Sequence, residues 1–161
     1  MQKAQRRIDE WVSLNDTTAV LELSYLHLTI LPELPQDLKI LLCNNNQLTE
    51  LPHLPQGLEE LYCYCNQLTE LPSLPQNLKG LLCENNRLTE LPPLPPSLIT
   101  LYCCNNQLTM LPLLPQGLER LYCEYNHLQY PPSEVMEKPL NEIKEWMSKN
   151  PLNLVKSAAK R

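Results

Sequence analysis

The stretch LYCYCNQLTELPSLPQ, residues 61–76, places two cysteines and two tyrosines directly before a proline-rich segment. It belongs to a pattern that recurs every twenty residues. Five blocks without insertion share the pattern L-P-x-L-P-x-x-L-x-x-L-x-C-x-x-N-x-L-x-x, and they span residues 31–50, 51–70, 71–90, 91–110 and 111–130. A fixed period of this length predicts that the chain folds as a stack of coils, one coil for each repeat.

The middle of each repeat, L-x-x-L-x-C-x-x-N-x-L, matches the leucine-rich repeat pattern, in which a short strand is followed by a tight turn and an irregular return. Side chains alternate along a strand, so each pair of the type Leu61 and Cys63 is predicted to point inward. The asparagine that follows, Asn66 in this repeat, is predicted to bond backbone groups that the turn leaves unpaired. The sequence therefore predicts a short leucine-rich-repeat solenoid of the α/β repeat class, with a parallel β-sheet on its concave face.

Both ends of such a stack expose apolar surface and need caps. Apolar residues at helical spacing predict an N-terminal helical cap in residues 1–16: Ala4, Ile8, Trp11 and Val12. Residues 17–132 hold one degenerate repeat and the five regular repeats. A second apolar stripe predicts a C-terminal helical cap in residues 133–161, which also contain a basic tail: Met136, Leu140, Ile143 and Met147.

Charge and cysteine content narrow the functional classes. The chain has 161 residues and a net charge of -5, and residues 31–130 carry ten acidic against four basic side chains. This acidic body disfavours a nucleic-acid partner, which normally needs a clustered basic surface. No stretch approaches the roughly eighteen consecutive apolar residues of a membrane span, so we expect no membrane partner. Seven cysteines in a buried register favour reduced thiols and a cytoplasmic location.

The outward side chains of the predicted strands form a candidate protein-binding surface. Its middle column is entirely apolar or aromatic: Leu42, Tyr62, Leu82, Tyr102 and Tyr122. Its flanks add one tyrosine and several charges: Tyr64, Glu60, Glu84, Arg120 and Glu124. Exposed contiguous apolar surface usually marks an interaction site, and the carboxylates would suit a basic partner segment. The alternative is that the tyrosines only cover the sheet, as cross-strand aromatic ladders do.

The cysteines and histidines do not predict chemistry. A metal site needs converging thiolates, whereas the cysteine column is linear and flanked by leucine, so we expect no metal and no cofactor. Cys104, on the concave face, is the thiol expected to react. No histidine lies beside an outward nucleophile and a carboxylate, so we predict no catalytic residue and no enzyme activity.

The repeat L-P-x-L-P-x-x-L-x-x-L, preceded by a helix and by VLELSYLHLTILPELP, resembles the leucine-rich repeats of bacterial effectors, as in YopM and the IpaH and SspH ubiquitin ligases. The resemblance covers roughly residues 5–132. It implies a curved scaffold that binds a protein, including a host protein, and thus action in the cytoplasm or in the host-cell cytosol. In the ligase subfamily a helical domain with a Cys-x-Asp motif follows the repeats. No Cys-x-Asp occurs in this sequence, so ligase activity is not implied.

We therefore predict a non-catalytic, effector-like scaffold for protein recognition. Two alternatives remain open from the residues alone. One is an adaptor that associates with itself as a homodimer through the tyrosine face. The other is the substrate-recognition half of a protein related to the leucine-rich-repeat ubiquitin ligases.

Overall fold

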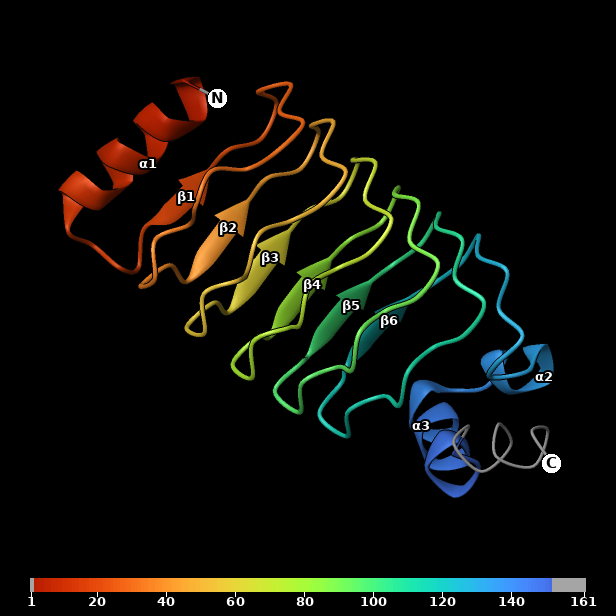
Figure 1. The fold of residues 1–161 in the computed structure, drawn as a ribbon. Coiled ribbons are helices and arrows are strands. Elements are labelled where there is room, and N and C mark those ends of the chain that lie inside the picture. Colours follow the sequence, from red (N-terminus) through yellow and green to blue (C-terminus); the bar gives the residue numbers. More distant parts are fainter. Residues whose placement is uncertain (1, 152–161) are drawn as a thin grey trace, which may run out of the picture.

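A computed structural model describes residues 2–151 of the chain. One helix, α1 (Gln2–Leu14), precedes six three-residue strands: β1 (Val20–Glu22), β2 (Ile40–Leu42), β3 (Glu60–Tyr62), β4 (Gly80–Leu82), β5 (Thr100–Tyr102) and β6 (Arg120–Tyr122). Two helices follow, α2 (Ser133–Met136) and α3 (Leu140–Lys149) (Figure 1). The predicted basic tail, LVKSAAKR at residues 154–161, lies outside the described residues.

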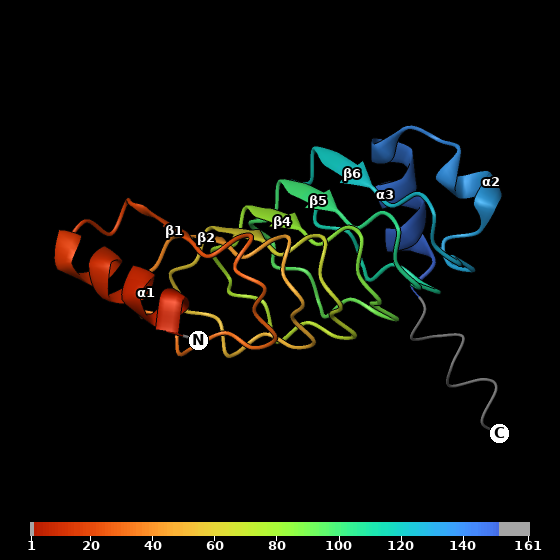
Figure 2. The same ribbon diagram turned by 90° about the horizontal axis from the view of Figure 1, so that it is seen from above.

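The strands form one parallel sheet in the order β1-β2-β3-β4-β5-β6, with a register that advances by one repeat for each strand. Ile40, for example, pairs with Glu60, and Leu41 pairs with Leu61. Seen from above, the strands line one side of the stack and the connecting segments line the other (Figure 2). This arrangement confirms the predicted leucine-rich-repeat solenoid with helices at both ends.

The core is the inward column that the alternation of strand side chains predicts. Leu61 and Cys63 are fully buried, as are the equivalent pairs in the coils before and after. Buried leucines at the other repeat positions fill the space between the sheet and the return side: Leu38, Leu48, Leu51, Leu54 and most of their successors. Each fully buried leucine contributes about 1.5 to 3 kcal/mol, so stacking of neighbouring coils supplies most of the stability.

The asparagine column satisfies backbone groups inside the turn, as predicted. The Asn86 amide nitrogen donates to the carbonyl oxygens of Cys63 and Cys83, both at 3.1 Å, and its side-chain oxygen accepts the N–H of Leu68 at 3.0 Å. Asn46, Asn66, Asn106 and Asn126 make equivalent bonds. Each buried group left unpaired would cost about 1 to 3 kcal/mol, so these side chains hold adjacent coils together.

One residue in each coil bends the chain through the left-handed region, and it precedes the repeat asparagine or, in the first coil, Leu26. Its φ lies between 52° and 58° in six successive coils: Tyr25, Asn45, Cys65, Asn85, Asn105 and Tyr125. Residues other than glycine and asparagine seldom adopt this backbone conformation. The strand β3 ends at Tyr62, and Cys65 therefore lies in the bend, beyond the buried Cys63 that directly follows the strand.

The helix α1 covers the first coil by burying Ala4, Ile8 and Trp11. The expectation that Val12 shares this face is wrong, because Val12 lies at the edge of the stripe and 55% of its surface is exposed. Trp11 also donates its indole N–H to the carbonyl of Ala19 at 2.9 Å. The first strand, Val20–Glu22, joins the sheet, so the imperfect first repeat forms a coil like the others.

The C-terminal cap is two helices rather than one. Met136 ends the short helix α2, and Pro139 directly precedes α3. Proline lacks the N–H needed inside a helix and suits its first turn, which explains the break. Ile143 and Met147 are buried, and Glu145 forms an ion pair with Lys149 on the exposed side of the helix. Within residues 2–151, no helix has the length and apolar character needed to cross a membrane.

Candidate protein-binding site

The outward side chains of the strands form one surface, which we call the sheet face. Its middle column runs in register across five strands: Leu42, Tyr62, Leu82, Tyr102 and Tyr122. The first four are partly buried by their neighbours, and Tyr122 is 47% exposed. The rings of Tyr102 and Tyr122 meet edge to face, with centroids 4.6 Å apart. The structure thus brings the predicted apolar column together as a continuous row.

A shallow hollow of about 370 Å³ opens beside this row where Gly80 has no side chain. Glu60 and Tyr62 line one side of it, and Thr100, Tyr102 and Arg120 line the other. The Tyr62 hydroxyl donates to the Glu60 carboxylate at 2.6 Å. This bond to an anion, together with burial, raises the pKa of Tyr62 to about 12. The phenol therefore stays protonated and keeps the Glu60 carboxylate at the rim of the hollow.

Two predicted carboxylates lie just after their strands. Glu84 is half-buried, and burial raises the pKa of its carboxyl. Its Oε2 atom is buried without a hydrogen-bond partner. Glu124 is exposed and accepts the Cys104 thiol through Oε2 at 2.9 Å. The two carboxylates thus differ, because Glu84 is partly withdrawn from solvent and Glu124 is not.

The thiols are poorly suited to reaction. Burial and the hydrogen bond to Glu124 raise the pKa of Cys104 to about 11. Because the thiolate is the reactive form, this argues against the expectation that Cys104 reacts readily. Burial raises the pKa of Cys43 to about 12, and the pKa values of Cys63 and Cys83 are also well above 9.0. Among residues 2–151, no three metal-ligating side chains converge.

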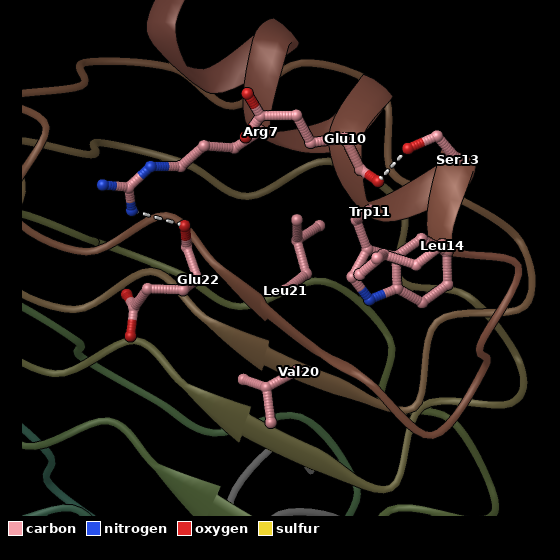
Figure 3. A pocket seen from close by; sticks show the side chains of 8 residues that line it. All are labelled: Arg7, Glu10, Trp11, Ser13, Leu14, Val20, Leu21 and Glu22. Carbon is pink, nitrogen blue, oxygen red and sulfur yellow. Dashed lines mark hydrogen bonds between the residues drawn. The ribbon is translucent and has the colours of Figure 1, made fainter.

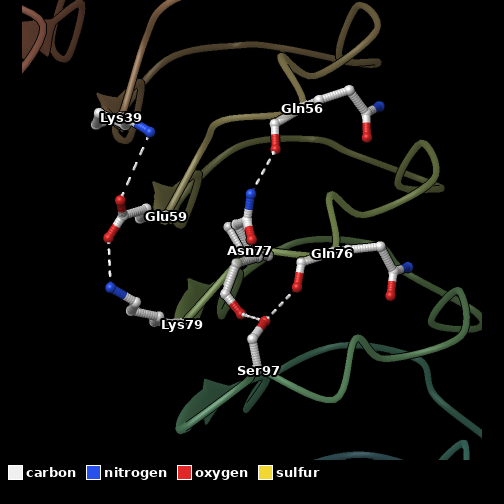
Figure 4. A network of polar contacts seen from close by, with 8 residues as sticks. Lys39, Gln56, Glu59, Gln76, Asn77, Lys79 and Ser97 are labelled. Atoms are coloured by element: carbon white, nitrogen blue, oxygen red, sulfur yellow. Dashed lines mark hydrogen bonds and ion pairs between the residues drawn. The ribbon is translucent and has the colours of Figure 1, made fainter.

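Sequence reasoning missed a polar network at the start of the strands (Figure 4). Glu59 bridges Lys39 and Lys79 on the neighbouring coils, and these partners lower its pKa. On the return side, Asn77 donates to the carbonyl of Gln56, and Ser97 donates to that of Gln76. The alternating charges at a spacing of twenty residues could have indicated the first of these contacts.

A second hollow, of about 580 Å³, lies between α1 and β1 (Figure 3). Arg7 crosses it and donates to the carbonyl of Glu22 at 2.7 Å. Leu14 and Val20 are 65% and 46% exposed there. The sequence did not predict this hollow, because it depends on the angle at which the helix meets the first coil.

Comparison with known proteins identifies the repeat type. A family model described as leucine-rich repeats in two copies matches residues 36–76. The leucine-rich-repeat domain of a Shigella effector superposes with a TM-score of 0.78 at 40% identity, over 81% of this chain and 59% of that one. YopM from Yersinia enterocolitica superposes with a TM-score of 0.76 at 43% identity, over 79% of this chain and 28% of the YopM chain.

YopM from Yersinia pestis gives a TM-score of 0.53 at 32% identity, over 75% of this chain and 46% of its own. This chain thus spans 59% or less of each of these three proteins. No curated protein sequence matches it. The similarity to effector-type repeats that the sequence predicts is confirmed.

Proposed function

The chain carries leucine-rich repeats of the bacterial effector type, and from this premise we propose that it is a non-catalytic scaffold that binds a partner protein on its sheet face. One observation carries the proposal: an unbroken apolar and aromatic row crosses five strands in register, at Leu42, Tyr62, Leu82, Tyr102 and Tyr122. Tyrosine is enriched among the residues that dominate binding energy, and solenoids commonly bind through the sheet side.

The charges around the row favour a basic partner segment. Glu60, Glu84 and Glu124 lie beside it, and Arg120 is the opposing charge among the predicted site residues. Burial raises the pKa of the Glu84 carboxyl, so a cationic side chain of the partner that lies against its exposed part would stabilise the charged form. An ion pair with a half-buried carboxylate contributes more than one with an exposed carboxylate, so we place the strongest polar contact at Glu84.

The cellular compartment in which the protein acts is also part of this proposal. All seven cysteines are free in the structure. Reduced thiols suit a cytosol, so we propose that the protein acts in the cytoplasm, which for an effector is the host-cell cytosol.

A capture experiment tests the binding proposal. Immobilised wild-type protein is incubated with host-cell lysate beside a triple variant with Tyr62→Ala, Tyr102→Ala and Tyr122→Ala. A protein that binds the sheet face is expected to be recovered with the wild type and lost with the triple variant. Leu113→Ala is the matched control, since Leu113 is 61% exposed and lies outside the row. Circular dichroism confirms that each variant is folded.

Two outcomes would contradict parts of the proposal. Equal recovery with the triple variant would mean that the tyrosines only cover the sheet. Unchanged affinity of the captured partner for a Glu60→Gln, Glu84→Gln variant would remove the carboxylates from the site.

A further inference from the structure

Gly80 is a glycine that the fold does not require. It is the first residue of β4, and the first residue of every other strand is larger: Val20, Ile40, Glu60, Thr100 and Arg120. None of the glycines has a positive φ, so the backbone does not demand one at this position. A Cβ atom added to Gly80 would lie 3.7 Å from Glu60 Cγ, which is an ordinary van der Waals distance. A glycine inside a strand weakens the strand and often marks a place where a ligand approaches closely.

The missing side chain leaves room for the hollow of about 370 Å³ on the sheet face. Glu60, Gly80, Thr100 and Arg120 pair in register from β3 to β6, so the two small residues separate the two charged ones. All four line the hollow, together with three residues of the apolar row: Tyr62, Leu82 and Tyr102. The hollow is therefore partly apolar, with a carboxylate and a guanidinium at opposite ends.

The two charges at the ends of the hollow do not neutralise each other. Their Cα atoms are three strand spacings apart, about 14 Å, and within residues 2–151 neither Glu60 nor Arg120 forms an ion pair. The Glu60 carboxylate accepts only the neutral hydroxyl of Tyr62. Lys79 also lines the hollow, but Glu59 pairs with it (Figure 4). The hollow thus presents one uncompensated anion and one uncompensated cation.

We propose that the hollow over Gly80 takes an extended segment of the partner protein that carries a basic side chain opposite Glu60 and an acidic side chain opposite Arg120. This inference rests on the proposed function, because it takes the sheet face as the binding surface. It adds the chemistry of the segment that binds there. Opposite charges facing each other across an interface select the partner and fix its register.

The distance between the charges sets the spacing in the partner segment. An extended chain advances about 3.3 to 3.6 Å for each residue, so side chains four positions apart span about 13 to 14 Å and point to the same side. The side chain midway between them also points to the protein, and it meets Gly80 and Thr100, where a small or apolar residue fits. A helix rises only about 1.5 Å for each residue and would need nine or ten positions between the charges.

Selection from a phage-displayed library of random peptides on the immobilised full chain tests the proposed segment. The enriched peptides are expected to carry a basic and an acidic residue four positions apart, in one prevailing order. The double variant Glu60→Arg, Arg120→Glu exchanges the two charges, and it is expected to select the reverse order. Arg87→Glu with Glu90→Arg is the matched control, because it makes the same exchange at two exposed residues outside the hollow. It is expected to select the wild-type order.

Filling the hollow tests the role of the glycine. Gly80→Thr introduces the residue that β5 has at the same position, and it is expected to raise the Kd of an enriched peptide about tenfold or more, measured by fluorescence anisotropy. The urea midpoint is expected to stay the same or rise, because threonine suits a strand better than glycine. Gly117→Thr is the matched control, since Gly117 lies outside the hollow and an added Cβ atom would meet only Pro96 O, at 3.8 Å.

Three results would overturn the inference. They are a selection that yields no peptides with the charge pair at this spacing, the same order of charges on the exchanged variant as on the wild type, and full affinity of an enriched peptide for Gly80→Thr.

The triple tyrosine variant separates failure of this inference from failure of the proposed function. Peptides that lose affinity for the triple variant but ignore the charge exchange and Gly80→Thr would overturn the inference and leave the sheet-face proposal standing. Peptides that bind the triple variant as tightly as the wild type would count against the sheet face itself.

Discussion

The two ends of the solenoid are covered to different degrees. At the N-terminal end α1 lies against β1, and the inward residues Leu21 and Leu23 are 1% and 0% exposed. At the C-terminal end α2 and α3 leave the inward residues Leu121 and Cys123 partly exposed. The inward positions are leucine or cysteine in both coils, so their chemistry does not explain the difference. What differs is whether a helix crosses the strand edge, as Arg7 of α1 does when it bonds Glu22.

The difference shows that the apolar pattern of a repeat sequence does not by itself determine whether the inward face of a terminal coil is covered. Patterning makes each coil able to bury its inward face, but a neighbouring coil or cap must supply the second surface. The two ends should therefore respond differently to the same substitutions.

The largest expected difference is in the free energy of unfolding lost when the tryptophan of each cap is replaced by alanine. Trp11 is 7% exposed and bonds the carbonyl of Ala19, whereas Trp146 is partly exposed and packs on Tyr130 with ring centroids 5.7 Å apart. Trp11→Ala is expected to lower the free energy of unfolding by about 3 to 5 kcal/mol. Trp146→Ala is expected to lower it by about 1 to 2 kcal/mol. Urea denaturation followed by circular dichroism measures both.

Val12→Ala provides the control for this pair, because Val12 lies on the same helix as Trp11 and is 55% exposed. Its effect is expected to stay within about 0.5 kcal/mol. Equal losses for the two tryptophan variants would show that the C-terminal helices cover the stack as well as α1 does, which would break the comparison.

Much of the fold could be predicted because the information is local and repeated. Alternation along each strand identified Leu61 and Cys63 as inward and Tyr62 as outward, and the asparagine column followed from the unpaired groups of a turn. Of the ten predicted site residues, seven lie on the strands β2 to β6, and Tyr64, Glu84 and Glu124 follow their strands. Whether they bind a partner remains a prediction.

The features that sequence reasoning missed depend on how elements meet. The partial exposure of Leu121 and Cys123 depends on the positions of α2 and α3, and contacts such as Lys144 with Leu118 help to set these positions. The unsatisfied oxygen of Glu84 depends on the side chains of the coils on both sides. Neither can be read from the period, because the repeat pattern specifies neither the cap geometry nor the identity of outward residues.

A smaller contrast is expected in thiol modification. Cys123 in the last coil is partly exposed, whereas Cys83 in an inner coil is fully buried. At about pH 8.5, iodoacetamide is expected to modify Cys123 at least tenfold faster than Cys83, because Cys83 must wait for the coils to separate. Peptide mapping by mass spectrometry measures both rates. Equal rates would mean that the last coil is closed in solution.

The pH dependence of this reaction has a definite sign. Burial, with a further contribution from Glu124, raises the pKa of Cys123 to about 12. The thiolate is therefore a minor species at pH 8.5, and its fraction rises about tenfold for each pH unit until the pH nears that pKa. The modification rate of Cys123 is expected to follow this fraction. A rate that levels off near pH 9 would show an unperturbed thiol.

The smallest expected effect concerns the left-handed bend. Asparagine occupies it at Asn45, Asn85 and Asn105, whereas Cys65 in an inner coil and Tyr125 in the last coil adopt the same conformation with less suitable side chains. Asparagine tolerates positive φ better, so Cys65→Asn and Tyr125→Asn are each expected to raise the free energy of unfolding by about 0.5 to 1 kcal/mol. Thermal and urea denaturation measure the gain, and Asn85→Ala, expected to lose a similar amount, is the control.

If backbone strain alone decides the outcome, the two gains should be equal, because the bend has the same φ at both places within a few degrees. A loss for Tyr125→Asn would mean instead that the Tyr125 ring, although 80% exposed, makes contacts that outweigh the backbone strain.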